Sequence, residues 1–248
     1  MTPRTLLALG AAVLAFSAGA LAFDGGTGIG GDVAVAAETS HDAAPVHVTK
    51  AELRRVDSIE LDAEALVLRN GDDTVVESSM RDSGLTVSVL NRLLGTPSRT
   101  QTAEGDGGAC FPAGTTYTWG GAIRVAALTT DAAAGNAVEI RVLRDSVRST
   151  LGKRIELTGP GGVRVGDDIA DEIADAPRSE RVSYGSDDSR AWQLLLREGW
   201  ADRRDDDDDD ESTKHGVDPG TNGVSALTNE TTVTVLGSPM PVHAQRSC

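Results

Sequence analysis

The sequence predicts an α+β protein built from two related halves, each a short helix packed on a small antiparallel sheet. Three observations support this prediction. A short apolar strand opens each half, Ser58–Leu61 in residues 51–150 and residues 154–157 in residues 151–248. A segment with helical periodicity then ends before a proline in each half. Segments with alternating apolar residues follow it, which is typical of strands.

The two predicted helices begin after residues 84–87 and 162–165, and they end before Pro97 and Pro177. Asp167 and Asp168 stand where the second helix begins, and the positive end of a helix dipole favours carboxylates there. Apolar residues recur at i, i+4 and i+5 in both segments, at Val89, Leu93 and Leu94 and at Ile169, Ile173 and Ala174.

The strands that follow come in unequal lengths. Residues 117–128 form either one long strand or a hairpin bent at Gly120-Gly121, and residues 138–143 form another strand. In the second half, we expect strands at residues 191–196, 224–227 and 232–236. Residues 203–215 form an acidic loop that interrupts this half, with aspartate at every position from 205 to 210. This loop is either a solvated insertion or a calcium site, and the sequence favours the insertion because the glycine of a calcium-binding turn is missing.

Residues 1–22 predict a secretory signal peptide. Arg4 precedes an apolar run, and Ala20-Leu21-Ala22 has the small-x-small pattern of a cleavage site. An uncleaved membrane anchor is the competing interpretation. Cleavage would leave no membrane-spanning segment, and no cysteine is placed there for a lipid anchor. We expect residues 23–50 to be a flexible lead. The chain is therefore predicted to be secreted or held in the cell envelope.

The amino-acid composition restricts the classes of molecule that the protein is expected to bind. The 248 residues carry a formal net charge of −15, and an acidic surface repels phosphate backbones, so nucleic acid is not an expected partner. The two cysteines, Cys110 and Cys248, are expected to form a disulfide in an exported chain. A reactive Cys110 is the alternative, although no thiol-enzyme motif surrounds it.

The sequence contains no recognisable catalytic, cofactor or metal motif. Residues 26–31 match G-x-G-x-x-G, but no strand precedes them and no helix follows, so we interpret them as linker. The four histidines, His41, His47, His215 and His243, lie in no catalytic pattern. The acidic pairs Asp72-Asp73, Asp167-Asp168 and Asp187-Asp188 are interpreted as solvated, because glycosidase clefts are rich in aromatic side chains and this chain is only 3% aromatic. No catalytic residue, cofactor or metal is predicted.

Trp119 and Trp192 are the candidate recognition residues. Both lie on predicted strands, one in each half. Core packing is the alternative for each ring, and an exposed aromatic platform would mark a binding surface.

Several of these features together resemble a known group of proteins. They are the export signal, residues 162–168 (GVRVGDD) opening a helix, residues 117–120 (YTWG) on a strand shortly after Cys110, and the terminal Cys248. They resemble secreted proteins and lipoproteins of actinobacteria, some of which have tandem α/β repeats similar to the beta-lactamase inhibitory protein, a non-enzymatic binder. An origin in a GC-rich genome fits the preference for Arg over Lys. The cysteine arrangement and the scarcity of aromatics depart from that inhibitor, so its target is not carried over.

These observations predict a secreted, non-enzymatic binding protein that recognises a protein or a component of the envelope. The alternative is an extracellular hydrolase with dispersed catalytic residues, for which Asp187 or Asp188 with His215 would be the candidates. Neither the oligomeric state nor the identity of the ligand follows from the sequence.

Overall fold

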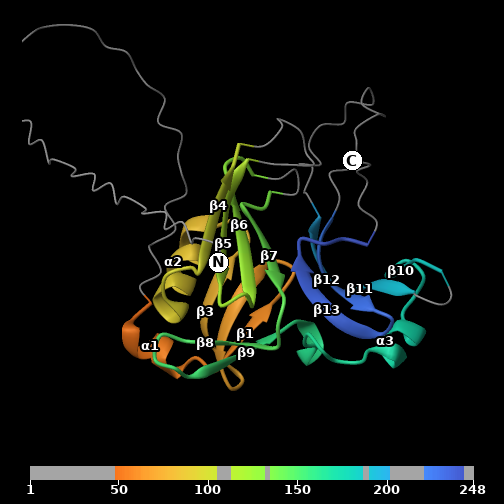
Figure 1. Ribbon diagram of the computed structural model, residues 1–248, viewed down its shortest axis with the longest axis horizontal. Coiled ribbons are helices and arrows are strands. Elements are labelled where there is room, and N and C mark those ends of the chain that lie inside the picture. The colour runs from red at the N-terminus through yellow and green to blue at the C-terminus, as the bar shows by residue number, and fades with distance from the viewer. Residues whose placement is uncertain (1–47, 105–112, 132–134, 187–189, 202–220, 243–248) are drawn as a thin grey trace, which may run out of the picture. The chain divides into compact units, whose positions relative to one another are not determined.

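The chain folds mainly as β-sheet (Figure 1). The computed structural model describes residues 48–104, 113–131, 135–186, 190–201 and 221–242. Within these ranges, thirteen strands form a five-stranded and an eight-stranded sheet, accompanied by three α-helices and one 3-10 turn. All described residues belong to one compact unit, residues 45–248.

The five-stranded sheet has the order β3-β2-β1-β9-β8. Its strands are β1 (Ser58–Leu61), β2 (Ala65–Asn70), β3 (Asp73–Ser79), β8 (Ser146–Arg148) and β9 (Arg154–Thr158). The central strand β1 pairs with β2 antiparallel and with β9 parallel, with Ser58 opposite Glu156. Burial alternates along β1, because Ile59 and Leu61 face the core while Ser58 and Glu60 face outward.

The eight-stranded sheet is antiparallel throughout and has the order β10-β11-β12-β13-β7-β6-β5-β4. Its strands are β4 (Arg99–Ala103), β5 (Gly114–Trp119), β6 (Ile123–Leu128), β7 (Val138–Val142), β10 (Arg181–Tyr184), β11 (Ala191–Ala201), β12 (Thr221–Asn229) and β13 (Thr232–Ser238). The pairing of β13 with β7 joins two groups of strands that lie far apart in the sequence.

A tight hairpin joins β5 and β6, as one of the two sequence interpretations predicts. Gly120 and Gly121 have positive φ angles of 56° and 65°, and the N–H of Ala122 donates to the carbonyl oxygen of Trp119 over 2.9 Å. Positive φ at both central positions is the requirement of the hairpin turn whose twist matches the strands. Glycine at both positions therefore selects this turn.

The helix α2 (Ser83–Leu94) confirms the first helix expected from the sequence. The Asp82 carboxylate accepts from the N–H of Leu85 and caps the N-terminus, and Gly95 follows the last turn with φ 87°. A stripe of buried side chains lies along one face, at Thr86, Val89, Leu90 and Leu93. The helix contacts β3 of the first sheet and β6 of the second. A shorter helix, α1 (Lys50–Arg55), lies against α2.

One hydrophobic core serves both sheets. Ile59, Leu61 and Leu157 from the first sheet belong to the same cluster as Ile123 and Ile140 from the second. Each of these side chains is at most 1% exposed. Burial on this scale is the main favourable contribution to folding.

The predicted α+β fold of two related halves, each with a helix on its own small sheet, is wrong. The two strands that resemble each other in sequence, β1 and β9, are neighbours in one sheet, and β7 and β13 join the expected halves in the other. Hydrophobic periodicity identifies a strand but not its partner, and here the partners come from opposite ends of the chain.

The expected second helix is present and ends before Pro177, but it begins slightly later than Asp167 and Asp168, where the sequence placed its start. Only α3 (Ala170–Asp175) is helical, and a 3-10 turn, η1 (Pro160–Gly162), stands where the repeat begins. Gly161, Gly162 and Gly166 have positive φ, which a helix does not accommodate. Val163 and Val165 pack on the core without being helical.

Candidate functional site

The first candidate recognition residue, Trp119, is a core residue. Its side chain is 1% exposed, and its indole N–H donates to the carbonyl oxygen of Gly95 over 2.9 Å. The ring stacks on Tyr117 with 6.1 Å between the centroids. A ring held in this way braces the end of β5 against the end of α2 and presents no exposed platform.

The second candidate, Trp192, lies half-buried on β11 between two arginines. The guanidinium carbons of Arg181 and Arg190 are 5.8 Å and 5.6 Å from the ring centroid, within the range of cation–π attraction. Arg181 also donates to the carbonyl oxygen of Ala174, in the last turn of α3, over 3.2 Å. This arrangement fixes α3 on the sheet, and the arginines engage the ring that a ligand would otherwise stack on.

Several other candidate residues lie outside the described residues. These are both cysteines of the predicted disulfide, the acidic loop at residues 203–215, and the alternative catalytic group: Cys110, Cys248, Asp187, Asp188 and His215. The disulfide stays a prediction.

The described acidic pair at residues 167–168 has a local structural role. Asp167 accepts from the backbone N–H of Arg164 over 2.8 Å, and Asp168 accepts from the N–H of Ala170 over 3.2 Å. Both carboxylates hold the turn that leads into α3, as aspartates commonly do near helix starts.

A small hollow with an apolar floor and a basic rim opens beside α1 and α2. Its volume is about 30 Å³, and its floor includes Leu53, Val56, Leu93 and Ile155. Its charged lining residues are all cationic: Lys50, Arg54, Arg92 and Lys153. Leu151 lies at its edge and is 59% exposed, one of two large hydrophobic side chains that the described surface leaves open. We call this the first hollow.

Backbone bonds position two cations of the first hollow. The Lys153 ammonium donates to the carbonyl oxygen of Val56 over 2.8 Å and to that of Arg55 over 3.3 Å. The Arg92 guanidinium donates to the carbonyl oxygen of Val48. Neutral carbonyl groups orient these side chains without cancelling their charge, so the rim stays positive.

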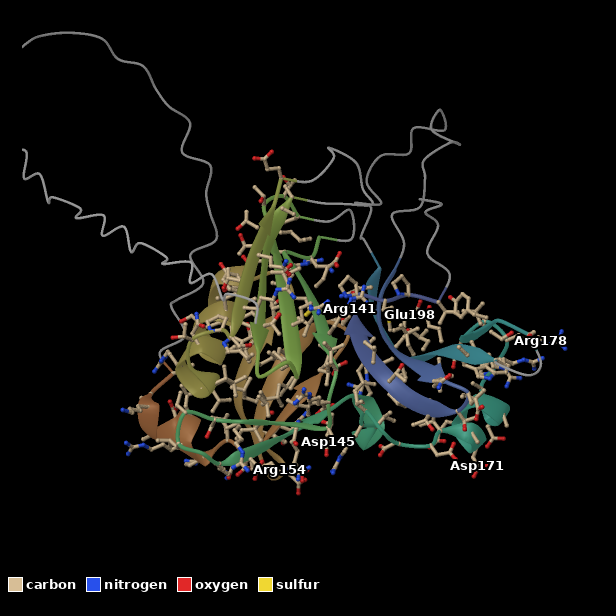
Figure 2. The ribbon with its side chains drawn as sticks, in the orientation of Figure 1. Arg141, Asp145, Arg154, Asp171, Arg178 and Glu198 are labelled. Carbon is tan, nitrogen blue, oxygen red and sulfur yellow. The ribbon has the colours of Figure 1, made fainter. Side chains whose placement is uncertain are left out.

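A larger hollow adjoins the first. This second hollow has a volume of about 460 Å³, and Trp119, Val147 and Leu94 contribute to its lining. Its charged lining residues are again all cationic: Arg144, Arg148 and Arg154. Arg154 pairs with Asp145 over 2.6 Å, and both side chains are more than half exposed (Figure 2). A pair this exposed is screened by water and exchanges readily for another anion.

The two hollows lie next to each other because consecutive residues line them. Leu93 and Lys153 line the first, while the next residues along the chain, Leu94 and Arg154, line the second. The N–H of Thr150 donates to the carbonyl oxygen of Leu93 over 2.9 Å and ties the segment after β8 to α2. Together the hollows collect seven cationic side chains and no carboxylate among their described lining residues. We call this surface the basic face.

The basic face contrasts with the other hollows of the described surface. A third hollow combines Arg154 and Arg164 with Asp57, Asp72 and Glu156. In a fourth hollow, acidic side chains outnumber basic ones, and Arg197 pairs with Asp62 there. Opposite charges are mixed in these two hollows, whereas the two hollows of the basic face are lined by charges of one sign.

Among the described carboxyl groups, the one with a shifted pKa borders the basic face. Two hydrogen bonds from Thr49, from its backbone N–H and its hydroxyl, lower the pKa of Glu52, and Arg55 and Arg92 lower it further. Glu52 is the third residue of α1, and its bond back to Thr49 completes a capping box. The negative charge of Glu52 therefore stabilises the N-terminus of α1.

The residues of the basic face were not identified from the sequence, although a signal was present. Residues 144–154 hold four cations and a single carboxylate in a chain with a net charge of −15. Lys50 and Lys153 are two of only three lysines, and both line the first hollow. The net charge of the whole chain is negative and does not reveal this local excess of positive charge.

Two further observations concern metal and membrane. Within the described ranges, no group of three or more potential ligands from His, Cys, Asp and Glu is placed to hold a metal ion. The longest helix in that part of the chain is α2, with 12 residues, and none there is long and apolar enough to cross a bilayer.

Comparisons of the chain with protein-family models, with curated proteins and with solved structures found no match.

Proposed function

We propose that this chain is an exported, non-enzymatic binding protein and that its basic face binds an anionic component of the cell envelope or exterior. The observation that carries the proposal is the gathering of seven cations around two adjoining hollows of an acidic chain. Like charges held close together raise the free energy of the unliganded protein, and an anionic ligand relieves that repulsion.

The net charge of −15 does not oppose this proposal. Repulsion from distant carboxylates is screened beyond about 10 Å at ordinary ionic strength, whereas cations that line one hollow act together on a ligand inside it. The local sign therefore governs binding at short range. The open shape of the second hollow suits a ligand that binds along a surface.

The chemistry of the side chains supports phosphate or carboxylate groups as the part recognised. Arginine presents a planar fork of donors that matches either group with two parallel hydrogen bonds. Arg144 and Arg148 are exposed in the second hollow and form no ion pair within the described part of the chain. Arg148 donates to the carbonyl oxygen of Gly152 over 3.3 Å, which leaves its charge uncancelled and its other N–H groups available to a ligand.

Binding to an immobilised anionic polymer tests the proposal. We expect purified protein to bind polyphosphate or polygalacturonate, and the double variant Arg144→Glu, Arg148→Glu to bind at least about tenfold more weakly. The matched control is Arg178→Glu, Arg190→Glu, which makes the same change in net charge near Trp192 and should bind like the wild type. Thermal unfolding of each variant checks that the fold is retained.

Three outcomes would contradict the proposal. The wild-type protein does not bind either polymer, both double variants lose binding equally, or only the control variant loses it. The second outcome would mean that net charge alone determines the affinity for the polymers. The third would mean that the polymers bind beside Trp192.

A further inference from the structure

The outward face of the eight-stranded sheet carries a second concentration of positive charge. In the register of the sheet, Arg99 lies opposite Thr118, Thr118 opposite Arg124, and Arg124 opposite Arg141. Residues that face each other on antiparallel strands point to the same side of the sheet. Arg99, Arg124 and Arg141 therefore form one row across β4, β5, β6 and β7, which we call the arginine row.

The arginine row points away from the core. Ile123, Val125, Ile140 and Val142, which flank its members on β6 and β7, are all buried. The three arginines themselves are exposed. Because adjacent strands lie about 4.8 Å apart, the row extends over about 14 Å.

No ion pair within the described residues neutralises the row, although Glu139 lies on the same face of β7, two residues before Arg141. Arg99 and Arg124 form no ion pair with any described residue, and Arg141 makes a weak hydrogen bond to the Met240 sulfur over 3.8 Å. Like charges directly opposite each other destabilise a sheet, and Arg124 faces Arg141 in this way. Such a pairing is explained if a negatively charged ligand binds there.

The row and the second hollow lie at the same end of the strands. Thr118 precedes Trp119, which lines the second hollow, and Arg144 of that hollow follows Arg141 by three residues. The Arg144 guanidinium also lies against the β5–β6 turn, 3.5 Å from the place where a Cβ on Gly121 would stand. The two basic surfaces thus meet at this turn.

We propose that the arginine row extends the basic face and that the ligand of both is an extended anionic polymer with repeating phosphate or carboxylate groups. This inference rests on the proposed function. One small anion reaches only the guanidinium groups within hydrogen-bond distance, so it cannot occupy the row and the hollows together. A polymer places successive charges along both, and its linked groups bind at a high effective concentration.

The surface of the row favours a polymer over a folded acidic protein. Protein interfaces depend on aromatic and large apolar side chains at their centre. On the described surface, the exposed large hydrophobics are Leu151 and Tyr184, and neither belongs to the row. Thr118 lies between Arg99 and Arg124 in the row, and Thr116 lies beside it on the same face of β5; their hydroxyls suit a polar chain.

A length series tests the inference with the full exported chain. Calorimetry would compare tripolyphosphate with long-chain polyphosphate and digalacturonate with polygalacturonate, so that phosphate and carboxylate sources are distinguished. We expect the row variant Arg99→Glu, Arg124→Glu to lose about tenfold or more in affinity for the long chains and little for the short ones. The hollow variant Arg144→Glu, Arg148→Glu should lose affinity for both lengths.

The outcomes separate this inference from the proposed function. Unchanged affinity of the row variant for long chains would overturn the inference and leave the proposed function standing. Unchanged affinity of the hollow variant for every probe would overturn the proposed function. Serum albumin is an acidic folded protein. If the wild-type protein bound albumin more tightly than either polymer, and the row variant lost that binding, the inference would also be overturned.

Discussion

The side-chain amide of Asn222 on β12 donates to the carbonyl oxygen of Ala63, which lies between β1 and β2. This bond links the two sheets inside the core, since both residues are completely buried. The same Ala63 oxygen accepts from the Ser238 hydroxyl over 3.3 Å, and the Asn222 side-chain oxygen accepts from the N–H of Gly223 over 3.0 Å. One asparagine thus satisfies polar groups of both sheets.

Replacing this asparagine should destabilise the protein strongly. Asn222→Ala removes both bonds and leaves the buried N–H of Gly223 without its partner, which we expect to cost about 1–3 kcal/mol in the free energy of unfolding. Urea denaturation followed by tryptophan fluorescence measures the loss. Asn229→Ala changes the exposed end of the same strand and should alter stability by less than about 0.5 kcal/mol. Equal effects of the two substitutions would show that the buried bonds contribute nothing specific.

Substitutions at two glycines with similar φ angles distinguish the cost of backbone strain from the cost of steric crowding. Gly71 (φ 59°) has no atom within 4 Å of an added Cβ, whereas a Cβ on Gly120 (φ 56°) would lie 3.2 Å from a methyl group of Val147. Gly71→Ala should cost about 1 kcal/mol from the left-handed backbone alone. Gly120→Ala should cost more, and thermal unfolding of both variants gives the difference. A smaller loss for Gly120→Ala would contradict the tight packing of the β5–β6 turn.

The lowered pKa of Glu52 predicts a pH dependence with a definite sign. A carboxyl whose pKa is lowered by folding stabilises the native state above its ordinary value of 4.5 and loses this contribution as the pH falls through the lowered value. Thr49→Val removes the hydroxyl donor, so we expect the pKa of Glu52 to rise toward its ordinary value. An NMR titration of the Glu52 carboxyl carbon measures it. An unchanged pKa would show that the hydroxyl bond does not stabilise the charge.

The predicted bridge between Cys110 and Cys248 is open to a direct measurement on secreted protein. Mass spectrometry after alkylation should find both thiols protected, and alkylation after reduction should label both. Loss of a bridge that closes so long a loop should lower the free energy of unfolding by about 4–5 kcal/mol in the entropic model. Two labelled thiols in unreduced secreted protein would refute the pairing.

The sequence predicted individual elements better than their arrangement. Ser58–Leu61 is a strand with the expected bounds, and the turn at Gly120 and Gly121 is a hairpin. These features depend on local periodicity and on glycine conformations, which neighbouring residues determine. The pairing of β1 with β9 depends on contacts between distant segments, and the repeated apolar pattern suggested a duplication instead.

The basic face was missed for a related reason. Its cations come from α1, from the end of α2 and from the segment around β8 and β9, and only the fold brings them together. The arginine row is likewise a property of strand register, because Arg99, Arg124 and Arg141 share no sequence motif. Trp192 and Trp119 were identified because they are conspicuous in the sequence, and the fold uses both in packing.

The parallel pairing of β1 with β9 also affects the order in which the chain can fold. While the protein is being made, β1 can align with β2 at once, but its other edge stays open until residues 154–158 have left the ribosome. Contacts between distant segments form slowly because a long loop must close first. If the chain is exported, as the proposed function requires, and crosses the membrane unfolded, this delay would keep the first sheet incomplete during transport, and the core would assemble on the far side of the membrane.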